Sequence, residues 1–225
     1  MIKRQSASTV AGLTVAWGGV LLLVSPAGRL LGPPGRLSTA LLEQLVLWVL
    51  AGLIAAIVVF LEQQPLSSLN LQPFRWSSVA WGVFLAAVMM YVLIPALTWA
   101  LRAAGIAGFE GGMAKALEAP LGLRIVAVIT AGVVEDTLFI GYAFTRLARL
   151  SGSRLLAGAV AVAVASVLHL PNWGWGPVLA YFVTGAVAVS FFAWRKDLLA
   201  NVVAHVTVDG MGLVLMPAVT RGFHH

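Results

Sequence analysis

The fold is decided by residues 121–147, which read LGLRIVAVITAGVVEDTLFIGYAFTRL. This run is long enough to cross a bilayer as a helix, because about 20 apolar residues span the hydrocarbon core. Two adjacent acids, Glu135 and Asp136, lie near its middle. An ionised Asp at the centre of a membrane helix costs at least about 2.5–3.5 kcal/mol, so such residues usually line a cavity or face a partner. The run therefore predicts a membrane span that carries an intramembrane site.

Six further apolar runs accompany it, at residues 9–24, 39–61, 79–101, 155–170, 177–194 and 198–219. Of the 225 residues, 60% are hydrophobic and 10% are charged. Soluble domains carry about a quarter charged residues. Each run should be helical, because a lipid-exposed backbone must satisfy its own hydrogen bonds. We therefore expect an all-α, polytopic transmembrane helix bundle of about seven spans. Residues 1–225 should form a single integral membrane domain, located in the cell membrane.

Charge and cysteine content exclude other classes. The net charge of +6 comes from 14 basic and 8 acidic residues, and the basic ones lie between apolar runs, as is usual at membrane edges. Membrane lipids are therefore expected partners and nucleic acid is not. The positive-inside rule places residues 146–154 and 195–197 on the cytoplasmic side. Without cysteine, the chain has no disulfide and no thiolate metal site.

The first run has two interpretations. Lys3 and Arg4 are followed by 16 apolar residues and by Val-Ser-Pro-Ala at 24–27. This order fits a secretory signal peptide with a cleavage site. It also fits a first span that is retained in the mature protein.

The ionisable residues divide into two groups. Five acids lie in connections or near span ends, where they are expected to reach water: Glu43, Glu62, Glu110, Glu118 and Asp197. Within the apolar runs lie Glu135, Asp136, His169, His205 and Asp209. His205 and Asp209 are four residues apart and share one helix face. The depths of Glu135, His169 and His205 differ by only about 7 Å at 1.5 Å per residue, so three helices can bring them to one pocket.

Such a set of side chains can activate water. A shielded carboxylate can act as a general base. Imidazoles can position water, bind a metal or donate to an oxyanion. Two His and one Glu also form a ligand set for catalytic zinc, although the local H-E-x-x-H signature is absent. A structural alternative for Glu135 is a hydrogen bond to a threonine of a neighbouring helix, for which Thr130, Thr145 and Thr184 are available.

Three motifs resemble those of the CPBP intramembrane proteases, the family of the CAAX prenyl endopeptidases and the bacteriocin-processing and immunity-type proteins. Residues 135–140 (EDTLFI) resemble its first motif, E-E-x-x-x-R. Residues 165–169 (ASVLH) resemble F-x-x-x-H, and residues 205–209 (HVTVD) resemble H-x-x-x-N or H-x-x-x-D. The motifs stand in family order and lie in a distinctive core at about residues 121–219.

The resemblance implies a CAAX-protease-like fold and an intramembrane endopeptidase that cuts a membrane-embedded or lipid-anchored peptide substrate. In this scheme Glu135 activates water, His169 positions it, and His205 with Asp209 stabilises the oxyanion. In the metalloprotease version, Glu135, His169 and His205 hold a divalent ion, zinc, and Asp209 is a fourth ligand or supports the others.

Two departures favour a catalytically impaired relative that acts by binding, for instance as a membrane immunity protein. Ile140 stands where the family has Arg, and Asp136 stands where it has a second Glu. At 3.6 residues per turn, position 140 lies about 140° around the helix from Glu135 and closer to Asp136. The family Arg is therefore expected to pair with the second acid. Without it, we expect Asp136 to be a supporting residue, neutral or bonded to hydroxyls or backbone, and Asp136→Asn to be tolerated.

Two other functional classes stay open. A proton-coupled transporter could relay protons over intramembrane carboxylates and histidines, and would be expected to show repeats or broken helices. A haem protein could use His169 and His205 as axial ligands.

Overall fold

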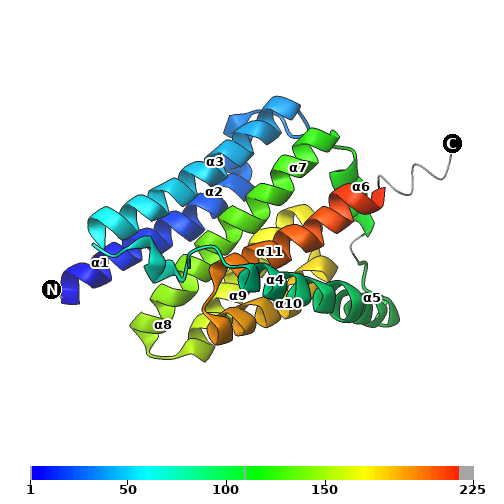
Figure 1. Cartoon of the computed structure of the whole chain (residues 1–225). Helices are drawn as coiled ribbons and strands as arrows, with labels where there is room; N and C mark the ends of the chain where they lie inside the picture. The colour runs from blue at the N-terminus through cyan, green and yellow to red at the C-terminus, as the bar shows by residue number, and fades with distance from the viewer. Residues whose placement is uncertain (1, 109, 218–225) are drawn as a thin grey trace.

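The computed structural model describes residues 2–108 and 110–217, and the regular structure within these ranges is helical (Figure 1). The elements in chain order are α1 (Ile2–Leu13), η1 (Thr14–Gly18), α2 (Gly19–Val24), η2 (Pro26–Leu31), α3 (Leu37–Ala56), η3 (Ile57–Leu61), η4 (Leu66–Leu69), α4 (Trp76–Val88), η5 (Met89–Leu93), α5 (Ile94–Ala103), α6 (Glu110–Leu117), α7 (Leu121–Thr130), η6 (Ala131–Phe144), α8 (Thr145–Ser151), α9 (Arg154–Trp173), α10 (Trp175–Arg195), α11 (Leu198–Gly210) and η7 (Met211–Leu215). Several of these pieces join end to end, so the chain forms a small number of long helical rods.

Six helices are long and apolar enough to cross a membrane: Ala7–Val24, Leu37–Leu61, Trp76–Ala103, Arg154–Trp173, Trp175–Arg195 and Leu198–Leu215. They correspond to six of the seven expected spans. The other expected span, residues 121–147, is helical throughout α7, η6 and α8 but is not among the six. Its middle departs from α-helical hydrogen bonding and is largely buried by the other helices.

The boundaries of two expected elements differ from the sequence prediction. The connection expected at residues 171–176 is mostly helical, because α9 continues through Pro171 and the chain turns at Gly174, whose φ is +81°. The last span was expected to end at residue 219. Its helix is described to Leu215 and slightly beyond, and residues 218 and 219 lie outside the described part of the chain.

Side-chain caps fix where the helices carrying His169 and His205 begin. Ser153 accepts a hydrogen bond from the Leu156 amide at the start of α9, at 3.2 Å. Asp197 accepts one from the Ala200 amide at the start of α11, also at 3.2 Å. Such caps satisfy amide groups that have no partner within the helix. Both helices therefore start at defined residues, which sets the register of the histidines.

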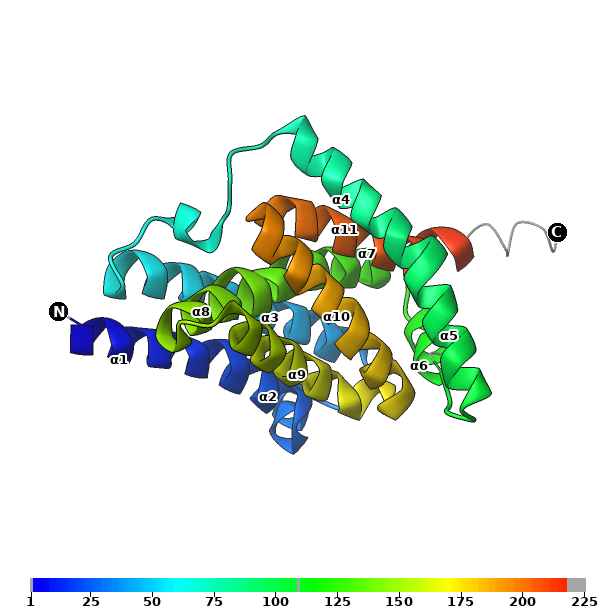
Figure 2. The same cartoon turned by 90° about the horizontal axis from the view of Figure 1, so that it is seen from below.

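Helix α11 lies at the centre of the bundle, between α4 and the η6 segment (Figures 1 and 2). Glycines allow this close packing. A Cβ at Gly82 of α4 would come within 2.6 Å of the Ala200 carbonyl oxygen, and a Cβ at Gly132 of η6 would overlap Cγ2 of Val206. Small residues let membrane helices approach closely. The two helices that flank α11 thus hold it where His205 faces η6.

The outer surface of the bundle is apolar. Phe60, Trp99 and Leu155 are exposed by 76%, 72% and 85%, respectively. Only lipid can solvate such a surface over six helices of this length, because an apolar patch of this extent is not stable in water. The chain is an all-α, multi-pass integral membrane protein.

Candidate active site

The two adjacent acids lie in η6, a segment with i→i+5 hydrogen bonding over Ala131–Phe144. Such π-helical geometry is rare and is often found at functional sites. Consecutive residues point to neighbouring faces of a helix, so the two acids contact different partners. Glu135 faces His169 of α9, and Asp136 faces His205 of α11. The single dipeptide thus connects the two histidine-bearing helices.

Glu135 and His169 form the first pair. Oε2 of Glu135 lies 3.6 Å from Nε2 of His169. The other ring nitrogen, Nδ1, lies 2.7 Å from the Ala165 carbonyl oxygen. A carbonyl oxygen can only accept, so Nδ1 carries the proton of this hydrogen bond. Nε2 is then the nitrogen presented to Glu135.

His205 lies between two carboxylates. Its Nδ1 is 3.0 Å from Oδ1 of Asp136, within hydrogen-bond distance. Its Nε2 is 3.6 Å from Oδ2 of Asp209, one helical turn further along α11. The hydrogen bond to Asp136 fixes the plane of the imidazole and leaves Nε2 facing the same side as Asp209. A carboxylate that orients a histidine in this way is a recurrent device in active sites.

Four of the five side chains are partly accessible, and the fifth is buried. The exposed fractions are 24% for Glu135, 23% for His169, 28% for His205 and 32% for Asp209, against 8% for Asp136. The four exposed groups can contact water or a substrate. Asp136 lies behind His205, and its Oδ2 is buried without a hydrogen-bond partner.

The sequence-based prediction for the partners of Asp136 was wrong. Asp136 bonds the imidazole of His205 and not a hydroxyl or the backbone. Ile140, in the position of the family Arg, is 7% exposed and packs in the apolar core. The predicted angle of 140° between Glu135 and Ile140 assumed 3.6 residues per turn. The i→i+5 bonding of η6 has more residues per turn, so the angle between residues five apart is smaller there.

The structural alternative for Glu135 required a threonine partner, and the three candidate threonines bond elsewhere. Thr130 accepts a hydrogen bond from the Trp48 indole at 3.0 Å. Thr145 and Thr184 donate to carbonyl oxygens of their own helices, at 2.6 and 3.0 Å. Glu135 instead has the His169 ring as its neighbour.

Sequence reasoning missed Tyr181, which belongs to none of the three motifs. Its ring packs on the His169 ring, with centroids 4.5 Å apart. The residue follows His169 by 12 positions and lies across the short turn at Gly174. Only the antiparallel arrangement of α9 and α10 brings the two rings together, so no periodicity in the sequence could have indicated the contact.

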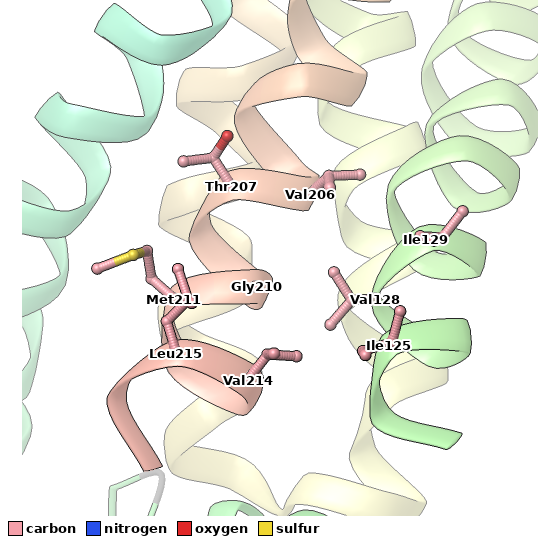
Figure 3. Close-up of a pocket in the computed structure, with 9 residues that line it drawn as sticks. All are labelled: Ile125, Val128, Ile129, Val206, Thr207, Gly210, Met211, Val214 and Leu215. Carbon is pink, nitrogen blue, oxygen red and sulfur yellow. The ribbon is translucent and has the colours of Figure 1, made fainter. Parts of the chain in front are cut away.

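An apolar groove of about 360 Å³ lies between α7 and the α11–η7 rod (Figure 3). It is lined by Ile125, Val128, Ile129, Val206, Thr207, Gly210, Met211, Val214 and Leu215. None of these residues belongs to the candidate site. Because consecutive residues of a helix point to different faces, the groove lies on another face of α11 than His205 and Asp209.

A second polar cluster is buried about Glu62, away from the histidines. The Arg146 guanidinium donates to Oε2 of Glu62 at 2.8 Å, and the Tyr142 hydroxyl donates to Oε1 at 2.9 Å. Thr9 donates to Oε1 at 3.2 Å, and Arg146 also donates to Oγ of Ser68 at 2.9 Å. The cluster joins α1, η3, η4, η6 and α8.

Two of the five acids expected to reach water are buried. Glu62 is 6% exposed because it pairs with Arg146, and Asp197 is 9% exposed because it caps α11. The Glu110 side chain lies outside the described part of the structure. A polar side chain at the end of a span can thus be buried when another helix, as for Glu62, or its own helix, as for Asp197, supplies the partner.

The arrangement of the proposed zinc ligands differs from the geometry that a metal requires. In the described ranges, no three side chains of His, Cys, Asp and Glu lie close enough together to hold a metal ion. Both ring nitrogens of His205 face carboxylates, Asp136 and Asp209, rather than a point shared with Glu135 and His169. As placed, the three-ligand set of Glu135, His169 and His205 does not fit a zinc ion.

The chain was compared with curated proteins, solved structures and protein-family models. No curated protein and no solved structure matches the chain. A protein-family model, described as type II CAAX prenyl endopeptidase Rce1-like, matches residues 117–211. The matched region contains η6, α9, α10 and α11, and with them every residue of the candidate site. This part of the chain is thus similar to the type II CAAX prenyl endopeptidases.

Proposed function

We propose that the protein is an intramembrane endopeptidase that hydrolyses a peptide bond of a membrane-embedded or lipid-anchored substrate, with water activated by Glu135 and His169. The observation that carries the proposal is that two neighbouring residues of η6, Glu135 and Asp136, each contact a histidine of another helix within the region matched by the family model. Glu135 lies 3.6 Å from His169, and His205 lies between Asp136 and Asp209.

The first pair is suited to holding a water molecule. Glu135 can accept a proton from that water, and Nε2 of His169 can accept a hydrogen bond from it because Nδ1 carries the ring proton. The water oxygen attacks the carbonyl carbon of the scissile bond, and its proton passes to Glu135. General-base catalysis of this kind contributes about 10²–10⁴-fold in rate.

The second pair is suited to stabilising the negative charge that develops on the carbonyl oxygen. When both ring nitrogens of His205 are protonated, Nδ1 donates to Asp136 and Nε2 can donate to the oxyanion. Asp209 lies one turn away on the same face. When the C–N bond breaks, protonated Glu135 returns its proton to the leaving amine. The second proton of the water passes from the new carboxyl group to the amine, so the products are a carboxylate and an ammonium group, and Glu135 is ready for another water.

The groove supports an apolar substrate. Its walls are nearly all aliphatic, and it lies between the two rods that carry Glu135 and His205. We propose that it receives an apolar part of the substrate, held by packing against the aliphatic walls.

A catalytically impaired relative that acts by binding is the second candidate, because Ile140 supplies no cation to the site. The Asp136–His205 hydrogen bond weighs against it, since the second acid has a partner without the family Arg. A haem protein is disfavoured by the engagement of both ring nitrogens of His205 with carboxylates.

The decisive experiment is Glu135→Gln in protein reconstituted into lipid vesicles. The probe is an internally quenched fluorescent peptide with a prenylated cysteine four residues from its C-terminus, beside the same peptide without the prenyl group. Cleavage is expected to fall by at least about 10²-fold. Unfolding followed through the eight tryptophans should remain unchanged. Equal cleavage by both proteins would overturn the proposed mechanism.

Two further measurements cover the substrate and the metal. Profiling of new N-termini in membranes that contain wild type or Glu135→Gln requires no chosen substrate. N-termini created by cleavage should appear with the wild type alone.

Metal analysis of purified wild type and Glu135→Ala tests whether Glu135 and His169 activate water without a metal ion. One zinc per chain, lost in the variant, would replace this metal-free mechanism with the metalloprotease mechanism.

A further inference from the structure

Tyr181 lies on the second turn of α10, outside the residues that carry the proposed chemistry. It is half-buried, and its ring meets two aromatic rings of α9. The His169 ring lies 4.5 Å away between centroids at an interplanar angle of 39°, and the Trp173 ring lies 6.2 Å away at 78°. His169 and Trp173 are four residues apart and share one face of their helix. Tyr181 therefore packs against the face of α9 that presents His169.

The imidazole of His169 has two torsions that must be fixed if Nε2 is to face Glu135. The hydrogen bond from Nδ1 to the Ala165 carbonyl fixes one edge of the ring at 2.7 Å. A single hydrogen bond still allows the ring to rock about that contact. The face of the Tyr181 ring closes the remaining direction, and it also keeps water from that side of the imidazole.

The ring contact with His169 brings α10 to the site, whose other residues come from η6, α9 and α11. An aromatic ring that served only lipid contact would not lie against an imidazole of the site.

We infer that Tyr181 is a positioning residue of the proposed peptidase, which holds the His169 ring so that Nε2 faces Glu135. This inference rests on the proposed function. The contact that would hold the ring is the aromatic packing of Tyr181 on the imidazole. A misplacement of about 1 Å in a reacting group can cost about 10²-fold in rate.

The kinetic test uses three variants reconstituted in vesicles with the quenched prenylated peptide. Tyr181→Leu removes the ring and is expected to lower kcat by about 10- to 100-fold with little change in KM. Tyr181→Phe keeps the ring and should recover kcat to within about fivefold of wild type. Phe182→Leu is the matched control, because Phe182 is the next residue and is 44% exposed on the outer surface. A loss in Tyr181→Phe as large as in Tyr181→Leu would overturn the ring-based role.

A spectroscopic test is independent of catalysis. The chain has four histidines, so labelled imidazole Cε1–H groups give few NMR signals. The His169 signal, assigned with His169→Gln, should show the ring-current shift of a stacked aromatic in wild type and Tyr181→Phe and lose it in Tyr181→Leu. An unchanged His169 signal in Tyr181→Leu would overturn the inference. If the shift behaves as expected but no variant or wild type cleaves peptide, the proposed function has failed and the ring contact stands.

Discussion

At the residue scale, the least expected feature is the role of Asp136. Asp136 points to a different helix face from Glu135. Because Ile140 stands where the family has Arg, the sequence predicted that Asp136 has no cationic partner. In the structure, His205 supplies the partner at 3.0 Å. A buried acid without a partner would cost several kcal/mol. The pair thus explains how the chain tolerates Ile140 in place of the family Arg.

We therefore expect Asp136→Asn to impair the protein, contrary to the expectation from sequence. Asparagine can still accept from Nδ1 of His205, but it supplies no negative charge to the ring. The expected loss in kcat is about 10- to 100-fold, with a larger loss in Asp136→Leu. Glu118→Gln, at an exposed position, serves as the control. Full activity in both Asp136 variants would mean that the His205 hydrogen bond has no part in function.

At the element scale, the site depends on the contact between η6 and α11. Gly132 lies four residues before Asp136, and a Cβ there would overlap Cγ2 of Val206, the residue after His205. Val206 is β-branched and has few rotamers with which to move away. The absence of a side chain at position 132 therefore sets how closely Asp136 approaches His205.

Gly132→Ala is expected to destabilise the protein by about 1–3 kcal/mol through overpacking. Gly52→Ala is the matched control, because a Cβ at Gly52 of α3 meets nothing within 4 Å. There the same change should be neutral or stabilising by about 0.5–1 kcal/mol, since alanine favours a helix. Thermal unfolding read by tryptophan fluorescence measures both. Equal shifts in the two variants would contradict the close packing of η6 on α11.

At the scale of the whole molecule, the cluster about Glu62 joins the N-terminal helix to the helices that carry the site. Arg146 is 2% exposed and Glu62 is 6% exposed, so neither charge is stabilised by bulk water. Removal of one partner of a buried pair typically costs about 3–5 kcal/mol, whereas replacement of both is often far less harmful.

Arg146→Met is accordingly expected to destabilise the protein by about 3–5 kcal/mol. The double variant Glu62→Met/Arg146→Met should recover part of that loss, because no unpaired charge remains. Denaturation in a common detergent compares Arg146→Met, Glu62→Met and the double variant. If the double variant is as unstable as the sum of the two single variants, the ion pair is not the source of the loss.

The same cluster favours retention of the first span. Thr9 donates to Glu62, a Cβ at Gly12 would overlap the Tyr142 hydroxyl, and Ala16 is fully buried in the core. Cleavage after residue 27 would remove all three contacts. We expect the intact mass of purified protein to include residues 2–27. A mass that begins near residue 28 would establish the signal-peptide interpretation.

The membrane class, the helical nature of the runs and the residues of the three motifs could all be predicted from the sequence. Hydropathy over about 20 residues is a local property. A motif of ionisable residues within an apolar run can likewise be recognised without knowledge of the tertiary structure.

The pairings between side chains, in contrast, arise only in the folded bundle. His205 bonds Asp136, Tyr181 packs on His169, and Glu62 meets Arg146, across separations of 69, 12 and 84 residues. The i→i+5 bonding of η6 changed which residues share a face, and a rotation of 100° per residue could not have predicted it. These contacts depend on how helices from distant parts of the chain pack together. That packing is determined by the whole bundle and not by any local stretch of sequence.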